Sequence, residues 1–336
     1  IAKQTAESLQ VENYDYQITM EEYISVLPRV IWEMDDPLAD PSAVALYIAN
    51  REAKKHVDVV LSGEGADELF GGYNIYRESE SLKYVSNLPN PMLKALNMVA
   101  SIIPEGVKGK SFLERATTPL KERYIGNAKI FEEKEKQKIL KQYDKQHTYQ
   151  AWTEPIYQQV QDQHAVEKMQ FIDVNTWLQG DILLKANKMA KANQLDVRMP
   201  FLDKAVFDIA QQIPVHFKIA DGTTKVILRR AALGIAPDHV LQQRKLGYPV
   251  PLRYWLKNDM YEWAIELIKM SETDDLIDKG TVLNLLHEHK YTKKDHARKI
   301  WTILVFMIWH QIFIENKFNF IQVNKQDKGL ELKEAF

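Results

Sequence analysis

Three carboxylates stand close together around a pair of glycines in the segment from Leu61 to Tyr73, which reads LSGEGADELFGGY. They belong to Glu64, Asp67 and Glu68. Such a cluster suits a hard cation such as Mg²⁺, which prefers a few carboxylates together with substrate phosphates. The segment lacks the Lys-Ser/Thr pair of a Walker A loop and does not follow the GxGxxG pattern. It is therefore a candidate phosphate and metal site of another kind.

The elements that must position these carboxylates can be read from the same region. An apolar run from Val57 to Leu61 predicts a buried strand, and Ser62-Gly63-Glu64-Gly65 ends it. A helical pattern follows, with acids in its first turn. Strand, glycine loop and helix together present backbone N–H groups to a ligand at the carboxyl edge of a sheet. The same junction also occurs without a ligand, so a purely structural role stays open.

The segment from Leu61 to Tyr73 resembles the second signature of the synthetase domain of glutamine-dependent asparagine synthetases. Three other segments support the resemblance, and the first is the loop from Asp35 to Ser42. DILLK with LDVRMPFLD, within residues 181–203, is similar to the part packed beside the nucleotide, and residues 244–252 (RKLGYPVPL) are similar to the family's Lys-x-Gly-Phe/Tyr-x-Val-Pro loop. The resemblance covers almost the whole chain.

The order of helices and strands before residue 76 predicts an α/β fold with a parallel sheet of few strands. Helical periodicity predominates from residue 76 onward. The resemblance implies that residues 1–75 are the remainder of an adenine-nucleotide alpha-hydrolase-like core. Residues 76–336 would be the mainly α-helical continuation of the same synthetase domain.

The resemblance also implies the roles of individual residues. Backbone groups of Leu61, Ser62 and Gly63 would cradle the nucleotide. Glu64 would orient aspartate or assist proton removal from the attacking ammonia, and Asp67 would hold Mg²⁺ and pyrophosphate. Lys245 matches the lysine that faces the reacting phosphate, where a fixed cation stabilises developing negative charge.

The activity implied is that of an ATP-dependent carbon–nitrogen ligase. With ATP and Mg²⁺ it would adenylate aspartate to β-aspartyl-AMP, and ammonia released from glutamine by a glutaminase domain would then give asparagine. Neither the family's first phosphate loop, Ser-Gly-Gly-x-Asp-Ser, nor any cysteine nucleophile occurs in the sequence. We therefore expect the C-terminal part of a longer enzyme, and expect this chain not to make asparagine unaided.

Two alternatives remain open at this point. A β-lactam synthetase-like enzyme would share the architecture and adenylate a different carboxylate. A nucleotide-binding remnant would carry no chemistry. The intact glycine turn at Ser62 and the loop at Lys245 favour asparagine synthesis.

Other charged residues allow both a structural and a functional interpretation. The loop from Asp35 to Ser42 is rich in turn formers, yet it resembles the family segment near nucleotide and aspartate, so Asp36 and Ser42 are candidate ligand contacts. Lys185, Lys188 and Lys191 share one side of a predicted helix, which is usually a solvated face. Lys185 could instead form an ion pair with Asp181, which is four residues earlier on the same predicted helix. We expect Arg198 to tie a loop to the sheet edge.

Composition limits the partners and the setting. The net charge of −2 gives no general attraction for nucleic acid or anionic membranes. Without cysteine there are no disulfides and no cysteine-ligated zinc. The longest apolar run, Trp301 to Ile314, is shorter than the roughly 20 residues of a membrane span and predicts a buried core helix. No secretory signal is visible, so a cytoplasmic location is expected, and a homodimer is compatible with the resemblance.

Further local patterns predict elements away from the glycine turn. They are a strand at Tyr14–Ile18, a helix from Thr19 to Trp32 interrupted or kinked at Pro28, a helix capped by Ser42 that ends near Lys54, a charged helix over Glu132–Gln146, and a helix capped by a threonine at Thr223-Thr224.

Overall fold

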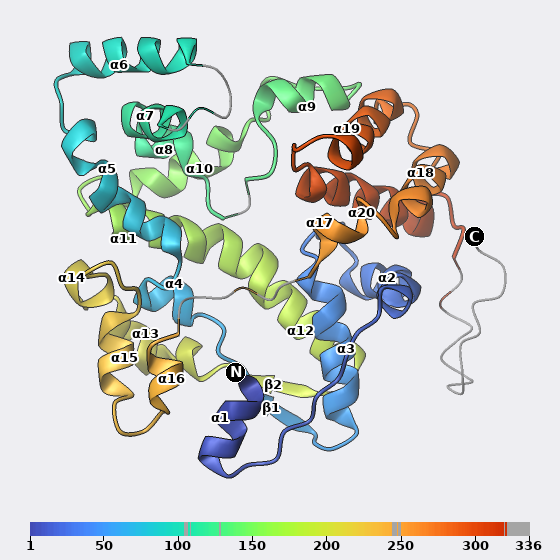
Figure 1. Cartoon of the computed structure of the whole chain (residues 1–336), viewed down its shortest axis with the longest axis horizontal. Helices are drawn as coiled ribbons and strands as arrows, with labels where there is room; N and C mark the ends of the chain where they lie inside the picture. Colours follow the sequence, from blue (N-terminus) through green and yellow to red (C-terminus); the bar gives the residue numbers. More distant parts are fainter. Residues whose placement is uncertain are drawn as a thin grey trace.

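The computed structural model describes residues 1–103, 107, 109–127, 129–243, 247, 250–318 and 320, so the candidate Lys245 lies outside the described residues. Helices dominate this part of the chain (Figure 1). The elements before residue 90 are α1 (Ala2–Leu9), α2 (Met20–Met34), α3 (Ser42–Lys54), β1 (Val59–Leu61), α4 (Ala66–Phe70), η1 (Asn74–Arg77) and α5 (Glu78–Ser86).

The rest of the chain is also helical, apart from one short strand among the described residues. The middle elements are α6 (Asn90–Ile102), α7 (Lys110–Thr117), α8 (Leu120–Arg123), α9 (Glu133–Ile139), α10 (Tyr149–Gln158), α11 (Ala165–Asp173), the π-helix η2 (Val174–Leu183) and α12 (Leu184–Ala192). The last are β2 (Asp196–Arg198), η3 (Pro200–Leu202), α13 (Lys204–Ala210), α14 (Val215–Lys218), α15 (Val226–Ala231), α16 (Asp238–Leu241), α17 (Leu252–Trp255), α18 (Tyr261–Met270), α19 (Lys279–Tyr291) and α20 (Ala297–Phe313).

The sheet consists, in the described residues, of β1 and β2, which run parallel with Val60 opposite Val197 (Figure 1). This confirms an α/β chain with few parallel strands and a mainly helical remainder. The strand β2 was not expected after residue 76, because three residues with charged ends carry no alternating pattern. The first strand's partner therefore comes from a segment well over a hundred residues further along the chain.

The prediction that β1 is buried is wrong. Val59 and Leu61 are 41% and 75% exposed, and only Val60, on the opposite face, is partly covered. Parallel strands are apolar on both faces when helices cover both faces of the sheet. Among the described residues no element covers the face formed by Val59 and Leu61, so its apolar side chains stand at the surface.

The main core lies around α20, as the apolar run from Trp301 predicts. Trp301 is 1% exposed, and α20 packs with α2, α18 and α19 in one hydrophobic cluster. The helix α2 runs through Pro28 without interruption, because Leu27 and Ile31 on either side are buried in this cluster. No helix in the part of the chain that the structure describes combines the length and apolarity needed to cross a bilayer.

Helix starts agree with the sequence only in part. The Thr19 side chain accepts a hydrogen bond from the Glu22 N–H at 3.2 Å, which confirms the predicted cap of α2. The start of α3 differs, since Ser42 is its first helical residue and donates its N–H to Asp40 Oδ1 at 2.8 Å. An aspartate two residues earlier thus takes the role expected of Ser42, as short carboxylates do in turns.

Three other local expectations are wrong wholly or in part. Residues 14–18 form no strand, because none of the segments that the structure describes pairs with them, and the Tyr16 hydroxyl donates to Glu22 instead. The charged helix α9 ends at Ile139, where the Leu140 backbone bridges to Ile277 instead of continuing the helix. No threonine caps α15, whose preceding residue is Lys225.

A second, smaller core surrounds a buried carboxylate at the end of α11. Asp173 is fully buried and accepts hydrogen bonds from the hydroxyls of Tyr76 and Tyr124 and from the side-chain amide of Asn127 at 3.1 Å. Burial raises the pKa of Asp173 to about 6, although the two tyrosine hydroxyls oppose the shift. The carboxylate therefore fixes η1, which follows Gly71-Gly72 and Tyr73, to α11.

Asp173 should make stability depend on pH. The folded carboxyl keeps its proton up to about pH 6, whereas an ordinary aspartate loses it near 3.8, so the free energy of unfolding should fall by about 3 kcal/mol as pH rises through this window. Asp173→Asn should lack this dependence. Urea unfolding at pH 4 and pH 7 should therefore give a wild-type minus variant difference that drops by about this amount. Asp208→Asn, on a half-exposed side chain, is the control; equal differences at both pH values for Asp173→Asn would contradict the prediction.

Candidate functional site

The glycine turn is held at the carboxyl end of β1 by contacts with β2 and η3. The Ser62 N–H donates to the Arg198 carbonyl at 2.8 Å. Gly65 adopts a φ of +85°, and a Cβ at this position would overlap the Leu202 side chain. Left-handed backbone and lack of space both require glycine here. The turn therefore presents a fixed backbone to its surroundings.

Of the backbone groups expected to cradle the nucleotide, one is already hydrogen-bonded and one faces open space. The Ser62 N–H donates to the Arg198 carbonyl of β2, whereas a Cβ on Gly63 would meet no atom within 4 Å. Leu61, at the end of the strand, is exposed. Space for a ligand is thus present beside Gly63, and a role for Leu61, Ser62 and Gly63 in nucleotide binding stays a prediction.

An ion pair joins the helix after the turn to a distant segment. Asp67 Oδ1 lies 2.9 Å from Lys225 Nζ, and the two side chains are only 14% and 21% exposed. Asp67 comes from α4, and Lys225 directly precedes α15, which packs on α4. A carboxylate able to bind a cation and an ammonium able to bind a phosphate therefore meet at the carboxyl end of β1.

Sequence reasoning missed Lys225, which has two unusual features that only the structure reveals. A cation at a helix N-terminus opposes the helix dipole, which favours negative charge there. Its φ of +54° is left-handed, a conformation that is uncommon outside glycine and is often retained at functional positions. Both features cost stability, so the position of Lys225 is a stronger pointer to a site than its residue type.

The lack of a side chain at Gly72 leaves space for the Asp67–Lys225 pair. A Cβ on Gly72 would overlap both the Asp67 carboxylate and the Lys225 side chain. The close approach, and not the backbone angle, requires glycine at this position. The second glycine pair of the segment therefore belongs to the same site as the first.

Gly72→Ala should push Asp67 and Lys225 apart. We expect the activity of the site to fall about tenfold to a hundredfold, because small displacements of positioned groups are costly. Steady-state assay of the enzyme proposed below would measure this loss. Gly180→Ala is the matched control, since a Cβ there meets nothing within 4 Å. Equal activity of the two variants would show that the pair does not contribute.

Glu68 does not join the carboxylate cluster expected from the sequence. It is 2% exposed and accepts a hydrogen bond from the Tyr73 hydroxyl, which in turn receives one from Trp177 Nε1 at 3.2 Å. Burial raises the pKa of Glu68. Because α4 turns successive residues to different sides, Asp67 faces Lys225 while Glu68 faces the interior. Among the described residues no three His, Cys, Asp or Glu side chains gather as a metal site.

Lys185, Asp40 and Asp181 form a buried cluster of charged side chains near the Trp177 ring. Lys185 Nζ contacts the carboxylates of Asp40 and Asp181, the latter at 2.9 Å, and lies 5.9 Å from the Trp177 ring. The predicted Asp181–Lys185 pair is thereby confirmed. Burial and the nearby Asp40 raise the pKa of Asp181 to about 7, whereas Lys185 overcomes the effect of burial on Asp40 and lowers its pKa. The neighbouring charges also raise the pKa of Lys185.

The expectation of one solvated lysine face is therefore only partly right. Lys185 is 5% exposed, Lys188 pairs with Asp35 at 2.6 Å, and Lys191 is exposed. The Asp35–Lys188 pair fixes the loop before α3 to α12. Asp36 is exposed and Ser42 is half-buried in this loop, and their contact with a ligand stays a prediction.

Arg198 ties the turn to the sheet through its backbone. Its carbonyl accepts the Ser62 N–H, whereas its guanidinium pairs with Asp196 at 3.0 Å and is 64% exposed. Glu64 lies half-buried in the turn. The structure thus brings together Glu64, Asp67 and the backbone of residues 61–63.

A parallel β-pair with a glycine turn and an acid–lysine pair at its carboxyl end defines a mainly helical α/β protein. The chain belongs to the asparagine synthase family, which matches residues 1–311. It is 53% identical over 328 residues to asparagine synthetase [glutamine-hydrolyzing] 1 of Bacillus subtilis (strain 168), covering 98% of this chain and 52% of that protein. It is 44% identical over 317 residues to a putative asparagine synthetase [glutamine-hydrolyzing] of Mycobacterium tuberculosis (strain ATCC 25618 / H37Rv), covering 94% of this chain and 49% of that protein.

A more distant similarity is that to amidase chry2 of Gibberella zeae. The two are 22% identical over 340 residues, covering 93% of this chain and 50% of the amidase. The chain spans about half the length of the curated relatives it matches.

Proposed function

We propose that this chain carries the synthetase site of a glutamine-hydrolysing asparagine synthetase. It would catalyse ATP-dependent amidation of aspartate to asparagine through β-aspartyl-AMP. Ammonia would come from a glutaminase domain outside these 336 residues. The single observation that carries the proposal is the Asp67–Lys225 pair at the glycine turn, 2.9 Å apart, in a chain of the asparagine synthase family.

The donor groups fit Mg²⁺ in the mode this ion uses with nucleotides. Mg²⁺ takes one or two carboxylates and completes its shell with waters and substrate phosphates. Asp67 would be that carboxylate, and its cation-binding character is supported by the Lys225 ammonium already beside it. When bound, the ion would neutralise phosphate charge. Loss of Glu68 from the cluster is compatible with this mode, because one carboxylate suffices.

The remaining roles follow from charge. Lys225 would hold the departing phosphates, and Lys245 would stabilise charge on the reacting phosphate. Glu64 would orient aspartate or accept a proton from ammonia as it attacks. Backbone groups of Leu61, Ser62 and Gly63 would hold the nucleotide, within an adenine-nucleotide alpha-hydrolase-like core drawn from residues 1–75 and continued by residues 76–336. The enzyme would act in the cytoplasm, where a homodimer is compatible with the family.

A second candidate is supported by the amidase similarity. Since distant relatives that match more than nine-tenths of this chain include proteins named amidases, a site that processes another carboxylate, as in β-lactam synthetases, is the principal alternative. A non-catalytic nucleotide-binding protein is the other. The Asp67–Lys225 pair argues against the last, because its side chains are only 14% and 21% exposed and partial burial of a charged pair has a desolvation cost.

A chimera tests the proposal. This chain would replace the matching segment of the Bacillus subtilis relative, and asparagine, AMP and pyrophosphate would be measured with ATP, Mg²⁺, aspartate and ammonium or glutamine. All three products should form, while the isolated chain should form none. A folded chimera that binds ATP but shows no aspartate-dependent pyrophosphate release would overturn the proposal, and activity with a different carboxylate would establish the alternative.

A further inference from the structure

Helix α6 is apolar on its outer side as well as on its inner side. The inner side packs on α7, where Ala100 is fully buried and the Asn97 side-chain amide donates to the Thr117 hydroxyl at 2.9 Å. The outer side carries four large apolar side chains that are 51–77% exposed, those of Met92, Met98, Val99 and Ile102. A helix that is apolar all round is normally covered on every side. Among the described residues nothing covers the outer side of α6.

The outer apolar residues of α6 form one stripe along the helix. Met92 is followed at three, seven and ten residues by Ala95, Val99 and Ile102, a spacing that places all four side chains on one face. Met98 borders this face beside Val99. The stripe therefore runs the length of α6 without a polar interruption.

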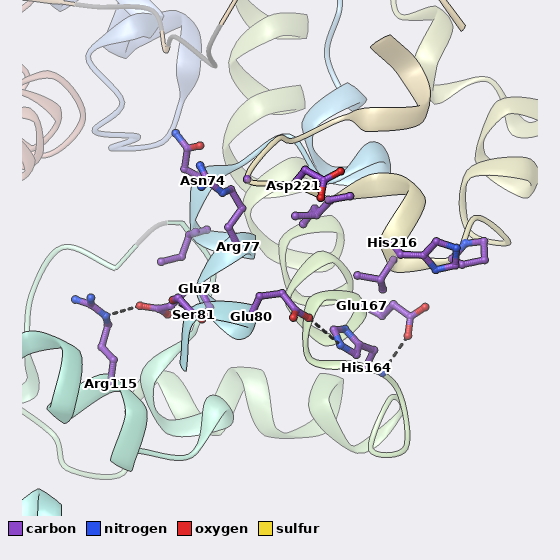
Figure 2. Close-up of a pocket in the computed structure, with 16 residues that line it drawn as sticks. Asn74, Arg77, Glu78, Glu80, Ser81, Arg115, His164, Glu167, His216 and Asp221 are labelled. Atoms are coloured by element: carbon purple, nitrogen blue, oxygen red, sulfur yellow. Dashed lines mark hydrogen bonds and ion pairs between the residues drawn. The ribbon is translucent and has the colours of Figure 1, made fainter. Parts of the chain in front are cut away.

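The outer side of α6 faces away from the rest of the molecule. The helix lies at the edge, beyond α7, and α7 in turn packs on α5 (Figure 1). Figure 2 shows how α7 is held there, because Arg115 of α7 forms an ion pair with Glu78 of α5 at the wall of a cavity of about 1310 Å³. The support behind α6 is thus fixed, and the stripe is presented outward.

The charges that accompany the stripe are positive. Residues 81–104 contain two lysines, Lys83 and Lys94, and no aspartate or glutamate, although the chain has 46 acidic residues. Both lysines are exposed, and neither forms an ion pair with a described residue. The cations of α7 differ, since Lys110 pairs with Glu114 and Arg115 with Glu78. An apolar helix face accompanied by unpaired cations is typical of a helix that lies on an anionic membrane.

The size of the stripe favours a lipid surface over a second copy of this chain. With 13 residues, α6 is about 20 Å long and about 10 Å wide, so its outer side offers roughly 200 Å². A stable protein interface takes about 800 Å² from each partner. Membrane binding has no such minimum, because it grows with each apolar side chain that inserts and with each cation at the surface. The helix is also shorter than the roughly 20 residues that a membrane span needs.

We infer that α6 docks on an anionic lipid surface and lies in its plane. The apolar stripe inserts among the acyl chains, and Lys83 and Lys94 contact the lipid phosphates. The contact is weak and reversible, since few side chains insert. This docking surface goes beyond the proposed function and does not depend on it, because α6 contributes no residue to the Asp67–Lys225 site.

Co-sedimentation of the chimera with lipid vesicles tests the docking surface. Vesicles of equal parts phosphatidylglycerol and phosphatidylcholine should bind the chimera, and pure phosphatidylcholine vesicles should bind it more weakly. Ile102→Asp should weaken binding about tenfold or more, because it places a charge against hydrocarbon. Ile235→Asp is the matched control, since Ile235 is 78% exposed, against 77% for Ile102, and lies outside α6. Unchanged binding in Ile102→Asp, or equal weakening in both variants, would overturn the inference.

The contribution of charge is measured separately. Lys94→Gln should weaken binding to the phosphatidylglycerol vesicles about fivefold, the effect of one cation near an anionic surface. Lys191→Gln, an exposed change on α12, should leave binding unchanged. Equal binding to both kinds of vesicle, with no effect of Lys94→Gln, would overturn the assignment of an anionic surface.

Two further outcomes would assign the stripe to another occupant and overturn the inference. A dimer in sedimentation velocity that Ile102→Asp dissociates, without vesicle binding, would identify a second copy. Vesicle binding by the isolated chain but not by the chimera would show that the other half of the chimera covers α6. A chimera that binds vesicles but makes no asparagine would defeat only the proposed function, and an active chimera that does not bind vesicles would defeat only the docking surface.

Discussion

Asp67→Asn is expected to lower aspartate-dependent pyrophosphate release in the chimera about a hundredfold to a thousandfold, the loss typical when one positioned charge-stabilising group is removed. Asparagine keeps the shape of the side chain but removes the negative charge that Mg²⁺ and Lys225 require. Both the metal ion and the Lys225 ammonium, which would face the phosphates, would then lack the carboxylate that holds them in place. The measurement is release of pyrophosphate under saturating ATP and aspartate.

The control for this loss is Asp58→Asn, on a side chain 87% exposed at the other end of the strand, which should keep full activity. Lys225→Met should also reduce the rate. If the two residues act as one unit, the double variant Asp67→Asn/Lys225→Met should be little worse than either single variant. Full activity in Asp67→Asn would remove the central residue of the proposed site, and strictly additive losses would show that the pair does not act together.

Local patterns predicted the features that depend on neighbouring residues alone. The turn at Gly63 and Gly65, the cap at Thr19 and the core helix around Trp301 all follow from short-range spacing. The Asp181–Lys185 pair was likewise visible, because residues four apart share a helix face. Family membership followed from the segment that contains the turn.

Features that depend on distant packing were not predictable from the sequence. Lys225 meets Asp67 across more than 150 residues, and Trp177 reaches Tyr73 across 104. The burial of Glu68 is decided by which side of a five-residue helix faces the interior, which a single turn does not specify. Whether a face of β1 is exposed depends on which distant elements pack on the sheet, and the local sequence pattern does not contain this information.

Lys185→Met is expected to lower the free energy of unfolding by about 3–5 kcal/mol at pH 8, the usual cost of removing one partner from a buried ion pair. Methionine fills similar space but leaves Asp40 and Asp181 as two neighbouring buried carboxylates. The raised pKa of Lys185 means that its contribution is fully present below its ordinary pKa of 10.5. Urea unfolding of wild type and variant measures the difference.

The loss caused by Lys185→Met should depend on pH, because the remaining acids escape repulsion by taking up protons. The pKa of Asp181 is already raised to about 7 in the wild type, so at pH 5 it binds a proton readily and the destabilisation should be smaller than at pH 8. Adding Asp181→Asn to Lys185→Met should recover part of the loss at pH 8 for the same reason. Lys191→Met, an exposed change on the same helix, should alter stability by no more than about 0.5 kcal/mol. A loss that is equal at both pH values and unaffected by Asp181→Asn would mean that Lys185 acts by packing beside Trp177 and not by charge.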